Sequence, residues 1–147
     1  MARRPFTADT SVIVASLLTW HEHHEVALRA LEEASAERPM FIPIPVLVES
    51  YAVMTRLPAP YRLSPSDAHA LLRDNFAKAR VGGLSGAECW KLLSDLSEHR
   101  VAGGRIYDAQ IVAAAVQASA ELMLTLNQVH FAYLAPAGLE VRSPLAP

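Results

Sequence analysis

Three acidic residues follow, interrupt or precede largely apolar segments of the chain. Asp9 follows the short run "PFTA", Glu49 lies within the apolar segment "PVLVESYAVM", and Asp108 precedes the alanine- and valine-rich segment "AQIVAAAVQ". Carboxylates within a few ångströms of one another repel unless they are protonated or bridged by a cation. Oxygen ligands of this kind suit Mg²⁺ or Mn²⁺, which also bind phosphates. If the fold gathers these acids, they predict a divalent metal site.

Each acid also has an ordinary structural explanation. Asp9 and Asp108 precede helical patterns, where an aspartate cap is worth about 1 kcal/mol, and for Asp108 alone the cap is the commoner role. Glu49 lies at the edge of an apolar helical stripe, two turns before Arg56, with which it could form an ion pair. These explanations stay open for each residue alone. Convergence of all three acids favours the metal.

Short strands alternate with helices along the chain. Strands are predicted at 5–8, 40–44 and 122–126, with weaker candidates at 79–84 and 139–143. Helices are predicted at 10–18, 21–37, 46–57, 64–79, 85–99 and 107–120. This alternation predicts an α/β layer fold with a mainly parallel sheet.

The predicted topology brings the acids together. In parallel sheets, ligands bind outside the carboxyl ends of the strands. Asp9 follows the first strand, and the helix that contains Glu49 starts where the second strand ends. Asp108 opens the helix that leads into strand 122–126, so this helix starts at the same edge. Acids far apart in sequence are therefore expected on one rim.

Composition narrows the class of protein. The 147 residues, 52% of them hydrophobic, predict one domain spanning residues 1–147 around a single core. The net charge of −2 argues against a strongly basic nucleic-acid-binding protein. A single cysteine, the lack of a signal peptide and the lack of a long apolar run predict a soluble cytoplasmic protein without a membrane segment.

Four segments together resemble a known family. In chain order they are "TADTSVIVA", "PVLVESYAVMTRL", "GGRIYDAQIVAAA" and "LMLTLNQVHF". They are similar to the motifs of PIN-domain ribonucleases, in particular VapC-type toxins of bacterial toxin–antitoxin pairs. The resemblance covers nearly the whole chain. It implies a three-layer α/β/α sandwich with a mainly parallel central sheet of four to five short strands.

The resemblance also implies an activity and partners. The expected function is that of a toxin, a Mg²⁺- or Mn²⁺-dependent endoribonuclease that cleaves RNA phosphodiester bonds. The expected partners are the RNA substrate, a cognate antitoxin protein and a second copy in a homodimer. The alternative is a catalytically weakened PIN fold that binds RNA or an antitoxin without cleavage.

The family motifs assign roles to residues of this chain. Asp9, Glu49 and Asp108 match the catalytic, metal-binding acids. The polar residues that support them match Thr10 or Ser11, together with Thr125.

Two positions depart from the family pattern. His130 and Asn127 stand where relatives commonly have acids, which puts a second metal in question. A His130 ligand would favour Mn²⁺ over Mg²⁺, because imidazole is a softer ligand than carboxylate. The alternative is that His130 lies at the rim of the site and contacts RNA or solvent while the three acids hold one metal. Arg105 is a candidate RNA contact.

Two other signals receive structural interpretations. The cluster "HEHHE" at 21–25 lacks the H-E-x-x-H spacing of a zinc site and is interpreted as a solvated connector. Trp20 and Trp90 are interpreted as core or dimer contacts, because they stand among apolar residues at helical spacing.

Overall fold

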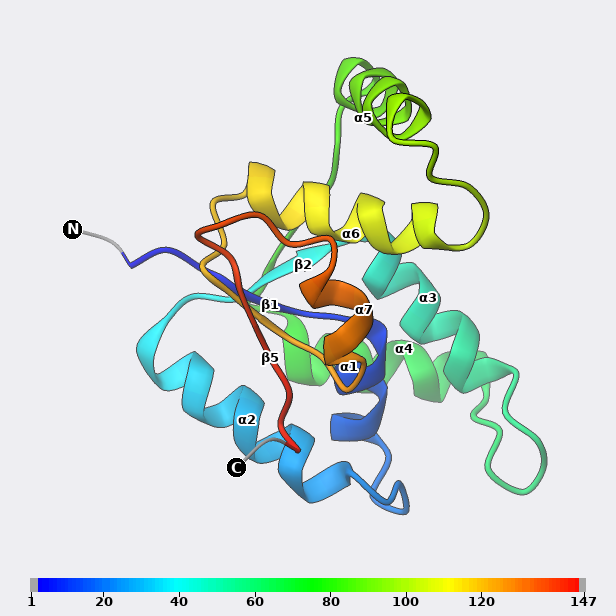
Figure 1. The fold of residues 1–147 in the computed structure, drawn as a ribbon. Helices are drawn as coiled ribbons and strands as arrows, with labels where there is room; N and C mark the ends of the chain where they lie inside the picture. Colours follow the sequence, from blue (N-terminus) through cyan, green and yellow to red (C-terminus); the bar gives the residue numbers. More distant parts are fainter. Residues whose placement is uncertain (1–2, 146–147) are drawn as a thin grey trace.

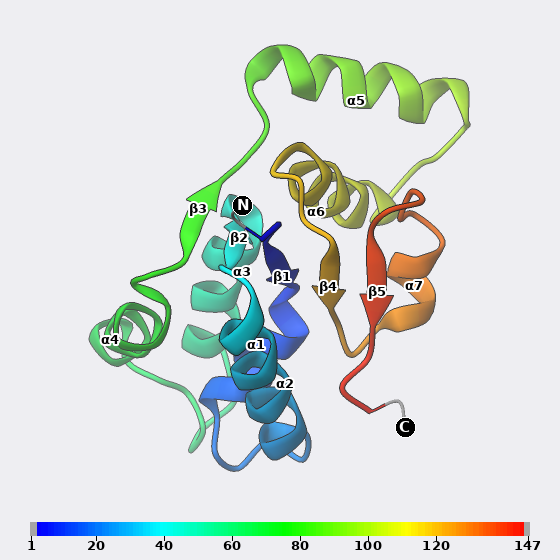
Figure 2. The same ribbon diagram turned by 90° about the vertical axis from the view of Figure 1, so that its left-hand side faces the viewer.

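The computed structural model describes residues 3–145 and contains five short parallel strands. The strands are β1 (Phe6–Ala8), β2 (Phe41–Pro43), β3 (Arg80–Gly82), β4 (Leu122–Leu124) and β5 (Glu140–Arg142). β1, β4 and β5 form one ladder, and β2 and β3 form another. A parallel bridge between Phe6 and Met40 joins them, which gives the order β3-β2-β1-β4-β5 (Figure 2). The predicted parallel sheet is confirmed, including its two weaker strands.

The structure contains seven helices within residues 3–145. They are α1 (Thr10–Leu17), α2 (His24–Glu37), α3 (Ile44–Thr55), α4 (Pro65–Phe76), α5 (Gly86–Glu98), α6 (Arg105–Gln117) and α7 (Gln128–Ala132). Figure 1 shows α6 on one side of the strands and α1 and α2 on the other, the expected layering. The short helix α7 was not predicted. No helix within this range is long and apolar enough to cross a membrane.

Local sequence signals explain where several helices begin. The Ser64 hydroxyl accepts a hydrogen bond from the backbone N–H of Asp67 at 3.1 Å and caps α4. Ser85 and Glu88 form a reciprocal capping box at the start of α5. The start of α6 differs from the prediction, because the helix begins at Arg105 and its cap position is Gly104. Asp108 therefore lies inside the first turn, and the capping role considered for it is wrong.

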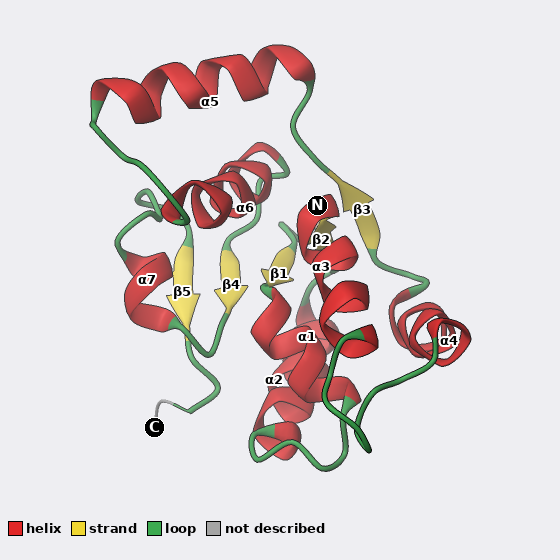
Figure 3. Cartoon of the chain, turned by 90° about the vertical axis from the view of Figure 1, so that its right-hand side faces the viewer, coloured by secondary structure: helices red, strands yellow, loops and turns green. Residues whose placement is uncertain are grey.

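The core forms where apolar side chains of β1, β2 and β4 meet the helices. Phe6, Ile13, Ile42, Met54 and Met123 are among its fully buried members. Helix α5 differs, since none of its residues is buried, and it lies outside α6 away from the strands (Figures 1 and 3).

Both tryptophans are exposed within this chain. The exposed fraction is 48% for Trp20 and 76% for Trp90. The interpretation of these residues as core is therefore wrong, and the dimer contact stays a prediction. Trp20 packs on Tyr61, with ring centroids 4.5 Å apart.

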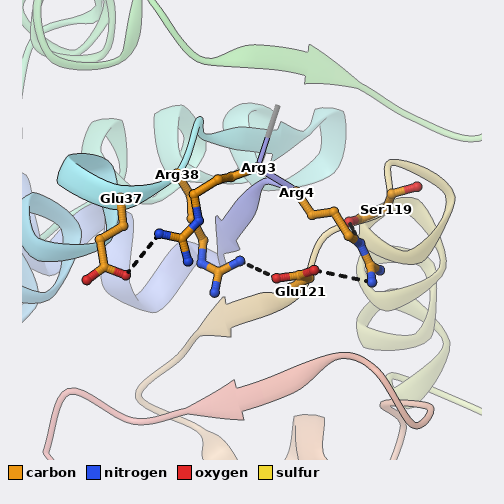
Figure 4. Close-up of polar contacts among 6 residues, drawn as sticks. All are labelled: Arg3, Arg4, Glu37, Arg38, Ser119 and Glu121. Atoms are coloured by element: carbon orange, nitrogen blue, oxygen red, sulfur yellow. Dashed lines mark hydrogen bonds and ion pairs between the residues drawn. The ribbon is translucent and has the colours of Figure 1, made fainter. Parts of the chain in front are cut away.

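An ionic network lies at the amino edge of the sheet (Figure 4). Glu121 precedes β4, and its carboxylate accepts a hydrogen bond from Arg38, which precedes β2. Its other oxygen lies 3.4 Å from a guanidinium nitrogen of Arg4, which precedes β1. Arg4 also donates to the carbonyl oxygen of Ser119 at 2.8 Å. The network therefore links the segments that precede β1, β2 and β4.

Candidate active site

Asp9 connects the carboxyl ends of β1 and β4. Its side chain is only 3% exposed, and one of its carboxylate oxygens accepts hydrogen bonds from the backbone N–H of Val12, at 3.3 Å, and from the Ser11 hydroxyl. The other oxygen accepts a hydrogen bond from the Thr125 hydroxyl at 2.7 Å. Asp9 thus caps α1, as its ordinary explanation predicted, but it also bonds to a residue 116 positions away.

The two hydroxyls that donate to Asp9 also hold the segment after β4. The Ser11 oxygen accepts the backbone N–H of Leu126 at 3.1 Å, and the Thr125 oxygen accepts that of Asn127 at 2.9 Å. Each hydroxyl therefore donates to the buried carboxylate and accepts from the loop. The position of this loop relative to Asp9 is fixed by four hydrogen bonds.

The three acids line one cavity, as the topology predicted. We call it the acid cavity; its volume is about 280 Å³. Asp9 contributes from the end of β1, Glu49 from the exposed side of α3, and Asp108 from the half-buried first turn of α6. The remaining lining residues are Thr10, Ser11, Val14, His21, Val53, Ile111, Leu126, Asn127 and Phe131.

Within residues 3–145, no ion pair involves these three acids. The pair considered between Glu49 and Arg56 is not present there. Burial raises the pKa of Asp9, its hydrogen bonds with Ser11, Thr125 and Val12 lower it, and the charge of Asp108 raises it further. The net direction is upward, because desolvation outweighs the hydrogen bonds. Negative charge in this cavity lacks compensation from the described side chains.

The donor set suits a hard divalent cation. The cavity offers carboxylate and hydroxyl oxygens, and Thr10, one of its lining residues, has a buried Oγ1 without a hydrogen-bond partner among the described residues. The acids share the cavity without forming a tight coordination shell: within residues 3–145, no group of three or more acidic, histidine or cysteine side chains is gathered closely enough to hold a metal. A hydrated cation, bound through one or two carboxylates and through water, fits this geometry.

The two positions that depart from the family pattern separate in the structure. Asn127 lines the acid cavity, whereas His130 lines a neighbouring cavity of about 250 Å³, which we call the side cavity. The side cavity is also lined by Arg105 and shares Asp108 with the acid cavity. His130 and Arg105 therefore lie next to the acids, on the far side of Asp108.

His21 is a site residue that sequence reasoning missed. The connector that contains it was interpreted as solvated, yet His21 lines the acid cavity. Its Nδ1 accepts the backbone N–H of His23 at 3.0 Å, so the neutral ring carries its proton on Nε2. Burial and the neighbouring charge of His23 lower the pKa of His21, which favours this neutral form. Its place at the very start of the second predicted helix, directly after the first, was the available signal.

Comparison with known proteins identifies the family. The PIN domain family model matches residues 7–135, a range that includes all three acids. The ribonuclease VapC40 of Mycobacterium tuberculosis is 41% identical over 115 residues, covering 78% of this chain and 81% of that protein. The ribonuclease VapC27 of the same species is 36% identical, covering 80% of this chain and 82% of that protein.

Solved structures show the same fold at low identity. The VapC20 toxin of Mycobacterium tuberculosis, which cleaves the sarcin-ricin loop, superposes with a TM-score of 0.67 at 17% identity, covering 87% of this chain and 94% of that one. VapBC2 of Rickettsia felis, bound to a promoter DNA fragment, gives a TM-score of 0.67 at 16% identity, covering 94% and 97%. The family model and the two VapC ribonucleases, together with the acids on one rim of a parallel sheet, show that the chain belongs to the PIN-domain family and to its VapC-type members.

Proposed function

We propose that this chain is a metal-dependent endoribonuclease and acts as the toxin of a toxin–antitoxin pair. The observation that carries the proposal is the convergence of Asp9, Glu49 and Asp108 on one cavity without a basic partner among the described residues. Two relatives that cover most of the chain are named ribonucleases. The proposed cofactor is Mg²⁺ or Mn²⁺, and the proposed protein partners are a cognate antitoxin and a second copy of the chain in the cytoplasm.

The side chains of the cavity divide the proposed work. When bound, a divalent cation would polarise the scissile phosphate and lower the pKa of an attacking water. Asp9, whose oxygens are held by Ser11 and Thr125, gives the site a fixed carboxylate. Asp108 contributes a half-buried carboxylate from the first turn of α6. Glu49 supplies an exposed carboxylate from α3.

Two nitrogen-bearing side chains of the acid cavity could contact RNA phosphate. His21 has a neutral Nε2–H to donate, and Asn127 has an amide. Neutral donors can contact phosphate oxygens without forming an ion pair with the acids. His21→Ala should raise KM for RNA several-fold, whereas replacement of the exposed His69 on α4 (His69→Ala) should leave it unchanged. Equal KM values for both variants would remove His21 from the substrate site.

Cation-dependent cleavage tests the proposal. Purified protein is incubated with total RNA after chelation, and Mg²⁺ or Mn²⁺ is then restored. Cleavage that stops with chelator and returns with the cation is expected, and sequencing of the new RNA ends gives the cleavage site. Expression without an antitoxin should also arrest growth.

A second function is favoured by two observations. The acids do not form a tight three-ligand cluster within residues 3–145, and His130 lies outside the acid cavity. A weakened fold that binds RNA or an antitoxin without cleaving would fit that geometry. RNA binding without cleavage in either cation would support this alternative and overturn the nuclease proposal.

A further inference from the structure

The side cavity offers a binding site next to the acids. It is formed by the first turn of α6 and by the α7 region, and its volume is about 250 Å³. Its lining residues are Arg105, Asp108, Val129, His130, Tyr133 and Leu134. Because Asp108 lines both cavities, a ligand in the side cavity lies directly beside whatever occupies the acid cavity.

Apolar and aromatic groups of this cavity are open to solvent. Tyr133 is 83% exposed and Val129 is 79% exposed, although both side chains are large and apolar in most of their surface. The guanidinium carbon of Arg105 lies 5.7 Å from the centroid of the Tyr133 ring. An aromatic ring, a planar cation and an aliphatic wall thus meet at one place.

This combination has the chemistry of a nucleobase site. Unpaired bases stack on aromatic rings and on arginine guanidinium planes, and their edges form hydrogen bonds with polar side chains. Tyr133 and Arg105 supply the flat surfaces, and His130 supplies a ring nitrogen for a base edge. Arg105 also offers donors for a neighbouring phosphate.

We propose that the side cavity binds one unstacked base of single-stranded RNA, in the nucleotide next to the scissile phosphate. This inference rests on the proposed ribonuclease function, since the acid cavity must hold that phosphate. Because Asp108 lines both cavities, the base and the phosphate would lie side by side. A base in an RNA duplex stays within its stack, so the site selects single strands, loops or bulges.

Equilibrium binding tests the base site separately from cleavage. The probe is a short single-stranded RNA that carries one fluorescent purine analogue, whose emission falls when it stacks on an aromatic ring. Binding is measured in an Asp9→Asn background with Mn²⁺ present, so that the RNA stays intact. Tyr133→Leu should weaken binding about tenfold and abolish the fall in emission, whereas Tyr133→Phe should retain both.

A matched control variant comes from the same region of the chain. Tyr107 is 71% exposed on α6 and is not among the residues that line the two cavities. Tyr107→Leu should bind the probe as the parent does, and annealing the probe to its complement should abolish the fall in emission. The proposal is overturned if Tyr133→Leu behaves as its parent, if Tyr107→Leu weakens binding equally, or if the duplex binds as tightly.

Cleavage by otherwise unchanged protein separates the two possible failures. If that protein cleaves RNA and Tyr133→Leu changes neither binding nor cleavage, the base site is wrong and the nuclease function stands. If that protein never cleaves but the emission falls only when the Tyr133 or Tyr133→Phe ring is present, the nuclease function is wrong. A base site in a binding protein would then remain.

Discussion

The two edges of the sheet shift the pKa of their acids in opposite directions. At the carboxyl edge, Asp9 shares a cavity with two other acids, and burial raises its pKa. At the amino edge, the hydrogen bond from Arg38 and the nearby charge of Arg4 lower the pKa of Glu121 (Figure 4). Each acid links β1 to β4. Asp9, at the end of β1, accepts a hydrogen bond from Thr125, which follows β4. Glu121, which precedes β4, forms an ion pair with Arg4, which precedes β1.

The difference teaches how to distinguish a structural acid from a functional one. An acid with arginine partners stabilises the fold, because its charge is compensated within the chain. An acid without such partners destabilises the fold while it is ionised and keeps its charge available for a cation. Perturbation of a pKa is therefore informative through its direction and its cause.

The largest expected effect is a loss of RNA cleavage when an acid of the carboxyl edge is replaced, but not when one of the amino edge is. Asp108→Asn should lower the rate of RNA cleavage about a thousandfold, because metal catalysis contributes several kcal/mol and about 1.4 kcal/mol corresponds to tenfold. Glu121→Gln at the other edge should retain the rate. The measurement is kcat/KM on one RNA in Mn²⁺, with Asp95→Asn on exposed α5 as a control. A fully active Asp108→Asn protein would contradict the functional assignment of the carboxyl edge.

The second effect is stabilisation by cations. Millimolar Mg²⁺ or Mn²⁺ should raise the melting temperature. A cation concentration of a hundred times Kd increases the free energy of unfolding by about 2.7 kcal/mol. Glu49→Gln should reduce this gain, because Glu49 lines the acid cavity. Glu121→Gln should preserve it, because Glu121 lies at the opposite edge of the sheet. Thermal melts with chelator and with each cation provide the measurement. A melting temperature indifferent to both cations would remove the metal from the carboxyl edge.

The third effect is a gain of stability from loss of the buried acid. Because the folded pKa of Asp9 is raised, its ionised form destabilises the protein at neutral pH, and this penalty disappears as the pH falls through the folded pKa. Asp9→Asn should raise the melting temperature by several degrees in chelator at neutral pH, and the gain should shrink on acidification. Asparagine keeps the capping ability. An unchanged or lower melting temperature at neutral pH would show that the lost hydrogen bonds outweigh desolvation.

The smallest effect is a decrease in melting temperature at neutral pH, opposite in sign to that of Asp9→Asn. The folded pKa of Glu121 is lowered, so its contribution is present above the unfolded pKa and is lost as the pH falls through the folded pKa. Glu121→Gln should lower the melting temperature by a few degrees at neutral pH and less in acid. High salt should also reduce the difference, because the network is partly exposed. A deficit that is constant over pH and salt would indicate packing as its cause.

The sequence by itself determined the parallel sheet and the rim on which Asp9, Glu49 and Asp108 meet. Strand and helix order fixes the edge at which each segment begins, since connections between parallel strands have one hand. The family motifs also singled out Ser11 and Thr125, which the structure places on the two oxygens of Asp9. The sequence left open whether these acids had basic partners.

Only the tertiary structure decided how the surroundings of the site are arranged. His21 lies in the acid cavity because of the path of the connector between α1 and α2, and His130 lies in the side cavity because the chain after β4 forms the short helix α7, which was not predicted. The start of α6 at Arg105, which removes Asp108 from the cap, depends on a glycine turn without a side-chain cap. Burial, counter-charge and loop position arise from contacts between residues far apart in the chain, such as Arg38 and Glu121 or Thr125 and Asp9, and local sequence cannot encode them alone.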